Sequence, residues 1–133
     1  DIIVMAAAVS DFRFKEVRSE KTGKAGLAGA IAVEPTEDIL ALLGKKKKAQ
    51  LLVGFAAETH DMLENARRKM ARKKADLMVA NPVGRGRGFG SGETEVHIIR
   101  PDGQVRSTPR LSKREASREI FDDIEALLEK KRR

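Results

Sequence analysis

Three short apolar runs constrain the fold of this chain more than any other feature. They lie at residues 1–9, Leu51–Ala56 and Asp76–Ala80, and the segments between them carry helix signals. Unbroken apolar runs of this length are typical of strands that are buried on both faces of a parallel sheet. Parallel neighbours need a crossover, and right-handed crossovers place helices on the faces of the sheet. The pattern therefore predicts an α/β fold, a Rossmann-like three-layer α/β/α arrangement with a mainly parallel sheet.

Cap and turn residues mark the remaining elements. Ser112 and Glu115 form a capping box at the start of a helix, and Pro101-Asp102-Gly103 is a turn between two strands of a hairpin. A chain of 133 residues suggests a single α/β domain over residues 1–133. The other predicted elements are a loop or mobile flap at 11–29, a short strand at 30–34, a helix capped by Thr36 and ended by Gly44, a helix from Thr59 or Asp61 to about Lys74, hairpin strands at 94–100 and 104–106, and a C-terminal helix from Ser112 to about Lys130.

Composition narrows the function classes. The 27 Lys and Arg against 20 Asp and Glu give a net charge of +7, which favours an anionic partner. The absence of cysteine excludes disulfides and thiolate chemistry and agrees with a reducing, cytoplasmic setting. The two histidines are far apart in the sequence and lack acidic neighbours at ligand spacing, so we expect no metal ligands in this chain. No apolar run approaches the roughly 20 residues of a membrane span, and five Phe without Tyr or Trp argue against a base-stacking surface.

All three apolar runs change to alanine just before a polar group. The changes are at Ala7-Ala8-Val9-Ser10-Asp11, at Phe55-Ala56-Ala57-Glu58-Thr59 and at Ala80-Asn81-Pro82. In an open parallel sheet, ligands bind beyond the carboxyl ends of the strands. Small side chains at these ends would let a flat ligand approach the main chain. The alanines could equally make room for helix packing, and the residues alone leave both interpretations open.

Three lysines are candidate phosphate ligands. Lys21 lies in "EKTGK" on the predicted flap, and Lys69 and Lys73 lie four apart on one edge of the predicted helix, beside its apolar stripe. Each also has a simpler interpretation: Lys21 as a solvated side chain, and the helix pair as cations that complement the helix C-terminus. No nucleophile lies in a pattern with a base, so nothing indicates covalent catalysis.

A resemblance to a known family decides between these interpretations. "AAAVSDFR", "EKTGK", "VGFAAET" and "RKMARKKADLMVAN" followed by "GFGS" occur in this order, and the chain resembles phosphopantothenoylcysteine synthetases from Asp1 to about Phe121. These form the carboxyl-terminal half of the bacterial bifunctional coenzyme A biosynthesis flavoprotein. The resemblance implies CTP-dependent joining of 4′-phosphopantothenate to L-cysteine through an acyl-cytidylate, with Mg²⁺ accompanying CTP. It also implies a homodimer that acts with, or is fused to, a flavin-dependent phosphopantothenoylcysteine decarboxylase, and no FMN in this part.

The resemblance also implies roles for individual residues. Lys21 matches the flap lysine on the triphosphate and is the expected catalytic residue. The expected nucleotide-binding residues are Ala7, Ala8, Asp11, Lys21, Glu37, Asp38, Ile39, Leu40, Phe55, Lys69 and Lys73.

Two departures qualify this expectation. Gly23 interrupts a flap that often carries a denser lysine cluster in the family, and the family's amino-terminal segment would lie upstream of Asp1. We therefore expect the nucleotide-binding part of a synthetase-like domain truncated at its N-terminus, without ligase turnover by itself. One alternative is a basic α/β module that binds nucleic-acid phosphates without catalysis. A dinucleotide-dependent oxidoreductase would need a G-x-G-x-x-G turn, which these residues lack.

Overall fold

The computed structural model describes residues 1–17, 19–20, 30–83 and 92–132. The chain forms two compact units, Asp1–Ala6 with Leu40–Arg133, and Ala7–Ile39. Each unit is described by itself below.

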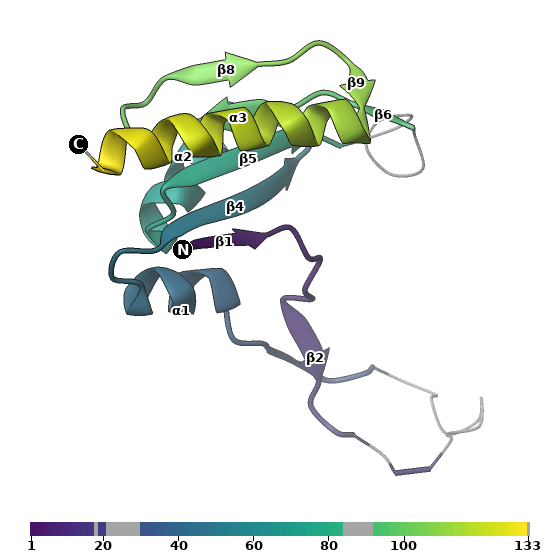
Figure 1. Ribbon diagram of the computed structural model, residues 1–133. Helices are drawn as coiled ribbons and strands as arrows, with labels where there is room; N and C mark the ends of the chain where they lie inside the picture. Colours follow the sequence, from purple (N-terminus) through teal and green to yellow (C-terminus); the bar gives the residue numbers. More distant parts are fainter. Residues whose placement is uncertain (18, 21–29, 84–91, 133) are drawn as a thin grey trace. The chain divides into compact units, whose positions relative to one another are not determined.

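The larger unit is built on a five-stranded sheet in the order β1-β4-β5-β7-β8 (Figure 1). The strands β1, β4 and β5 are parallel, and β7 and β8 follow as an antiparallel hairpin. This confirms the predicted α/β fold with mainly parallel core strands and a hairpin. The bounds are β1 (Ile2–Met5), β4 (Leu51–Glu58), β5 (Leu77–Pro82), β7 (His97–Ile99) and β8 (Val105–Ser107), with β6 (Glu93–Thr94) and β9 (Leu111–Ser112) in a small second sheet and the helices α1 (Ile39–Lys46), α2 (Met62–Lys73) and α3 (Lys113–Arg132).

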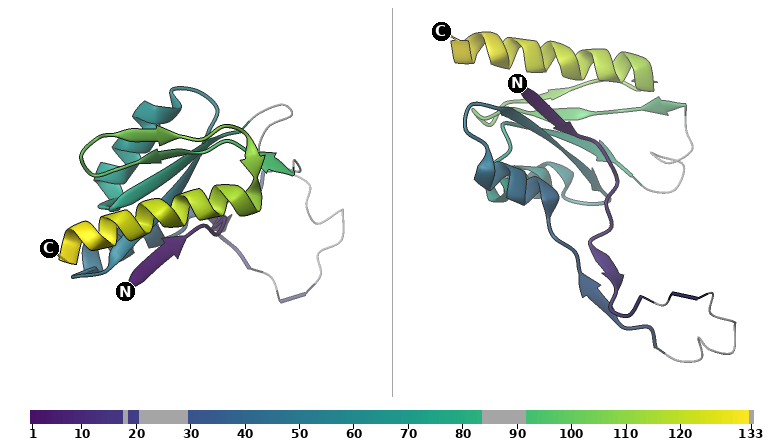
Figure 2. Two further views of the ribbon diagram at one scale, coloured as in Figure 1. Left: turned by 45° about the horizontal axis from the view of Figure 1, so that its top comes forward. Right: turned by 60° about the horizontal axis from the view of Figure 1, so that its bottom comes forward.

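The helices cover the sheet in two layers. Figure 2 shows α3 on one side of the sheet and α1 and α2 on the other. One apolar core joins alternate residues of β4, β5 and β7 to α3, with Ile120 and Ile124 at its centre. The second core joins the other alternate residues to α1 and α2 through Leu40, Ala66 and Met70. Since β4 and β5 contribute to both cores, their side chains are buried on both faces, as the apolar runs predict.

The first strand differs from its prediction. We expected a strand over residues 1–9 that is buried on both faces, but β1 ends at Met5 and forms an edge of the sheet. Its side chains alternate between exposed and half-buried, and Ile2 and Val4 are each 40% exposed. The exposed alanines that follow offer no bulky side chain that would hold the chain against the sheet. The β1 strand therefore ends opposite Gly54, four residues before the end of β4.

The boundaries of α1 also correct the prediction. The helix begins at Ile39, and the hydroxyl of Thr36 donates a hydrogen bond to the Ser10 carbonyl instead of capping it. Gly44 does not end the helix, which continues to Lys46. A Cβ at Gly44 would lie 1.9 Å from the Lys73 carbonyl oxygen, so this glycine permits the close approach of α1 to the end of α2.

Other predicted boundaries agree within a few residues. The α2 helix begins after Asp61, and β5 continues beyond the end of its apolar run at Ala80 to Pro82. In the capping box of α3, Glu115 accepts hydrogen bonds from the Ser112 backbone and hydroxyl, at 3.0 and 2.6 Å. No helix in the described part of the chain is long and apolar enough to cross a membrane.

The smaller unit contains an antiparallel pair of strands, β2 (Phe12–Phe14) and β3 (Val33–Pro35). The β2 strand lies within residues 11–29, which were predicted as a loop or flap. The prediction missed it because an alternation of apolar and polar residues over only three positions is hard to detect among charged neighbours. Opposite residues in an antiparallel pair share a face. Phe12 and Phe14 therefore lie on one face with their partners Pro35 and Val33. The other face carries an ion pair of 2.7 Å between Arg13 and Glu34.

Candidate functional site

The candidate site of the larger unit lies at the carboxyl ends of β4 and β5. The two strands end together, since Glu58 is the partner of Pro82 in the register. Alternation along β4 places Ala56 in the core beside α2, while Phe55 packs against the core beside α3. Glu58, two residues after Ala56, shares its face of the strand. The end of β4 therefore presents a carboxylate toward α2 and an aromatic ring on the opposite face.

Lys69 of α2 pairs with this carboxylate. Its Nζ lies 2.5 Å from Oε1 of Glu58, whose side chain is 12% exposed, whereas the Lys69 side chain is 38% exposed. Glu58 Oε1 is buried and has no hydrogen-bond partner among the described residues, so the contact has the distance of an ion pair without the alignment of a hydrogen bond. An ammonium group has three donor protons, so Lys69 retains capacity for the oxygens of an anionic ligand.

The other predicted residues of this unit have different surroundings. Lys73 is half-buried at the C-terminal end of α2, one turn after Lys69. Leu40 is 4% exposed and belongs to the core between α1 and the sheet, so its side chain is not placed to bind a nucleotide, and only its main chain suits the predicted role. The structure thus places Lys69 and Lys73 along one helix. Phe55 and Lys69 lie on opposite faces of the sheet: Phe55 is three residues before the end of β4, and Lys69 contacts the last residue of that strand.

The smaller unit carries the remaining predicted residues. Ala7, Ala8 and Asp11 are exposed, and so are Glu37, Asp38 and Ile39. Two hydrogen bonds join these two segments: the Thr36 hydroxyl donates to the Ser10 carbonyl, and the Thr36 N–H donates to the Asp11 carbonyl at 2.9 Å. The structure therefore brings together two stretches that the family resemblance assigns to one nucleotide site. Lys21, the expected catalytic residue, lies outside the described residues.

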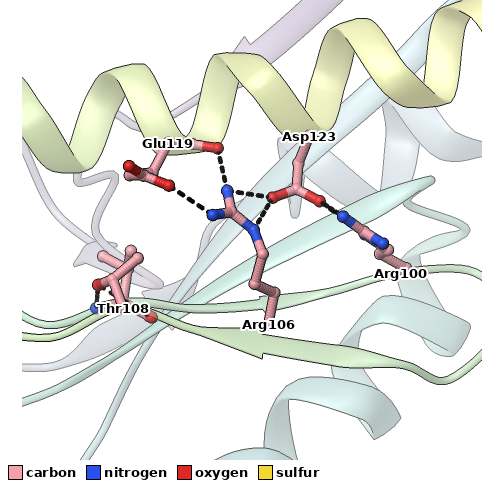
Figure 3. A network of polar contacts seen from close by, with 6 residues as sticks. Arg100, Arg106, Thr108, Glu119 and Asp123 are labelled. Atoms are coloured by element: carbon pink, nitrogen blue, oxygen red, sulfur yellow. Dashed lines mark hydrogen bonds and ion pairs between the residues drawn. The ribbon is translucent and has the colours of Figure 1, made fainter.

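A second charged cluster joins the β7–β8 hairpin to α3 (Figure 3). Asp123 has a fully buried side chain and receives Arg100 on one carboxylate oxygen and Arg106 on the other, with Nε to oxygen distances of 2.6 Å for both. Arg106 also pairs with Glu119. Burial disfavours the charge of Arg106, but its hydrogen bonds to Glu119 and Asp123 outweigh this and raise its pKa. Sequence patterns give no signal for this cluster because its members lie far apart in the sequence, just after β7, in β8 and in α3.

Within the described ranges, no three His, Cys, Asp or Glu side chains lie close enough together to hold a metal ion.

Comparison with known proteins assigns the family. A model described as "DFP: DNA/pantothenate metabolism flavoprotein C-terminal domain" matches residues 1–128. The chain belongs to this family. Within the DFP family, the coenzyme A biosynthesis bifunctional protein CoaBC of Bacillus subtilis (strain 168) is 46% identical over 128 residues, which cover 96% of this chain and 32% of the relative. The chain thus spans about a third of the length of the curated relatives that it matches.

Solved structures of other proteins share the fold. The crystal structure of the C-terminal domain of a CoaBC protein aligns with a TM-score of 0.76 and 38% identity, over 98% of this chain and 56% of that chain. A Cab2 mutant in complex with phosphopantothenate-cysteine aligns with a TM-score of 0.73, over 98% of this chain and 44% of that chain, at 20% identity. At that identity the second likeness shows the fold alone.

Sequence reasoning had not assigned a role to Glu58. It noted the residue only as the polar group after two alanines, and the pairing with Lys69 depends on how α2 packs across β4. The Thr36 bridge between the two segments of the smaller unit was also missed, because a threonine before a helix is typical of a cap.

Proposed function

We propose that this chain is the nucleotide-binding part of a phosphopantothenate–cysteine ligase that uses CTP in coenzyme A biosynthesis. The observation that carries the proposal is the lysine of α2 at the shared end of two parallel strands, in a chain that is 46% identical to part of CoaBC. Ligands of open parallel sheets bind at this edge, and a cation there suits a phosphate. Since the relatives are bifunctional, we propose that the chain acts with a flavin-dependent phosphopantothenoylcysteine decarboxylase.

The proposed reaction has two displacement steps. A carboxylate oxygen of 4′-phosphopantothenate attacks the α-phosphorus of CTP, forms the acyl-cytidylate and displaces pyrophosphate. The amine of L-cysteine then attacks the acyl carbon, an amide bond forms, CMP leaves and the amine loses a proton. Both steps require positioning and stabilisation of charge on phosphate oxygens more than acid–base chemistry.

The lysines supply that stabilisation in the proposal. Lys69 and Lys73 bind the triphosphate from α2, Phe55 lies against the nucleotide, and Lys21 joins them as the catalytic lysine. Ala7, Ala8 and Asp11 contact the cytidine, with the main chain of residues 37–40 beside them. Mg²⁺ enters with the nucleotide, because at such sites it is held largely by phosphate oxygens and water.

Calorimetric titration with CTP, ATP, UTP and NADPH in the presence of Mg²⁺ tests the proposed function. We expect binding that is selective for CTP. In Lys69→Met the affinity for CTP should fall about tenfold, because one charge-assisted contact is lost. Lys113→Met, which removes an exposed cation at the start of α3, is the matched control and should bind CTP as the wild type does. Affinity that ignores the nucleotide and falls steeply with salt would instead favour the nucleic-acid alternative.

We also propose that the protein is a homodimer. The support is the apolar face of the β2–β3 pair, where Phe12 is 59%, Phe14 61% and Val33 54% exposed. An exposed apolar face on a two-stranded sheet is typical of a contact surface.

A further inference from the structure

We infer that Glu58 is a positioning residue, which holds the ammonium group of Lys69 at the end of β4 so that it meets the phosphates of the nucleotide. The inference rests on the proposed function, because it concerns the same site. It adds a residue that the resemblance did not assign, and it follows from the ion pair between Lys69 Nζ and Glu58 Oε1 at 2.5 Å.

Glu58 is suited to this role because its own position is fixed. It is the last residue of β4, pairs with Pro82 of β5, and its backbone carbonyl accepts a hydrogen bond from the Val83 N–H at 3.0 Å. Its side chain is 12% exposed, so the carboxylate has little freedom to follow Lys69 into solvent. A carboxylate fixed in this way sets the place of the ammonium group, rather than the reverse.

Lys69 needs such a partner because its side chain is long and flexible. A lysine on a helix surface samples many rotamers, and ordering it when a ligand binds reduces affinity. Pairing with Glu58 orders the side chain before the ligand arrives. The pair uses one side of the ammonium group, and the remaining N–H donors stay available to phosphate oxygens. The 38% exposure of Lys69 keeps that side accessible.

Ordinary surface ion pairs do not behave in this way. An exposed pair has small net energy, because water solvates both groups almost as well. Glu58 is largely buried, and its Oε1 has no hydrogen-bond partner within the described residues, so Lys69 supplies the nearest compensating charge. Loss of the carboxylate therefore frees Lys69, and loss of Lys69 leaves Glu58 without its counter-charge.

A double-mutant cycle on the full-length protein tests the inference. CTP binding with Mg²⁺ is measured by calorimetry for the wild type, Glu58→Gln, Lys69→Met and the double variant. We expect Glu58→Gln to weaken CTP binding about fivefold, and to have no further effect once Lys69 is replaced. Glu64→Gln removes an exposed carboxylate from the same helix and should leave the affinity unchanged. Steady-state turnover of the complete ligase, of which this chain is the proposed nucleotide-binding part, adds a second readout: KM for CTP rises in Glu58→Gln while KM for L-cysteine does not.

The outcomes separate the inference from the proposed function. Suppose that the wild type binds CTP and that Glu58→Gln binds it equally well or more tightly; then Glu58 does not position Lys69. The same conclusion follows if Glu58→Gln weakens binding as much in the Lys69→Met background as it does in the wild type. If the wild type itself binds no CTP, the proposed function fails, and the inference fails with it. Should Glu58→Gln not fold, Glu58→Asp provides the test, because it keeps the charge but moves the carboxylate one methylene back toward the strand, away from the place where Lys69 is held.

Discussion

Asp76 joins three segments of the larger unit through its two carboxylate oxygens. Oδ2 accepts hydrogen bonds from the Leu52 N–H at 2.8 Å and from Lys47, and Oδ1 pairs with Lys131 at 3.0 Å. Burial acts to raise the pKa of Asp76, but the hydrogen bonds from Lys47, Leu52 and Lys131 outweigh it and lower that pKa. The residue therefore ties the start of β4 to the ends of α1 and α3.

We predict that Asp76→Asn lowers the free energy of unfolding at pH 7 by about 1–3 kcal/mol, because the amide cannot balance two lysines. The folded-state pKa lies below the unfolded value of about 3.9, so the contribution is complete above that pH and is lost as pH falls through the folded pKa. Urea denaturation at pH 7 and pH 3 checks this. Asp122→Asn, on the exposed face of α3, is the control, and an equal loss at both pH values would contradict the argument.

Single residues also show where sequence reasoning reaches its limit. The chemistry of "VGFAAET" placed Phe55 and Glu58 at a strand end, and the structure confirms that end. The role of Gly44 was predicted wrongly, because a glycine near the end of a helical pattern usually terminates it, whereas here it faces the Lys73 carbonyl. Contacts between α1 and α2 are long-range, and no local pattern encodes them.

At the scale of elements, the β7–β8 hairpin and α3 are joined by charge as well as by the apolar core. Asp123 is fully buried on α3, and its two arginine partners, Arg100 and Arg106, lie beyond β7 and in β8 and are each 34% exposed (Figure 3). We expect Asp123→Asn to lower the free energy of unfolding by about 2–4 kcal/mol. This loss is smaller than the loss expected for a fully buried ion pair, because water reaches the arginines and partly screens their charge. Thermal and urea unfolding measure this.

The control for that experiment is again Asp122→Asn, a neighbour on the same helix whose side chain is exposed. A loss in Asp123→Asn no larger than in this control would mean that the arginines are solvated equally well without the carboxylate. The attachment of the hairpin to α3 would then rest on the pairing of Arg106 with Glu119 and on the apolar contacts of Ile98.

Elements were predictable where local signals were strong. The buried strands β4 and β5 have unbroken apolar runs, and α3 has both a capping box and a helical apolar stripe. The β2 strand and the early end of β1 were not predictable, because both depend on what the neighbouring segments offer for packing. The same reason applies to α1, whose start is displaced when Thr36 bonds to Ser10 instead of capping it.

At the scale of the whole molecule, the larger unit explains why a family resemblance and a physical interpretation of the sequence point to the same residues. Parallel β4 and β5 end together, and the helix that follows β4 returns across it with Lys69 beside that end. The geometry of a βαβ crossover therefore brings a helix cation to a strand terminus even though 11 positions separate Glu58 from Lys69 in the sequence.

Assembly is the last property of the whole molecule that the structure allows us to predict. If the apolar face of β2–β3 is the contact between two copies, Phe14→Glu should convert a dimer to a monomer, because a charge on a 61% exposed phenylalanine opposes its burial. Size-exclusion chromatography with light scattering measures the mass of each variant. Phe121→Glu makes the same chemical change on α3, at a phenylalanine that is 53% exposed, and should leave the dimer intact. A wild-type monomer, or a dimer that both variants retain, would show that this face is not where copies of the chain meet.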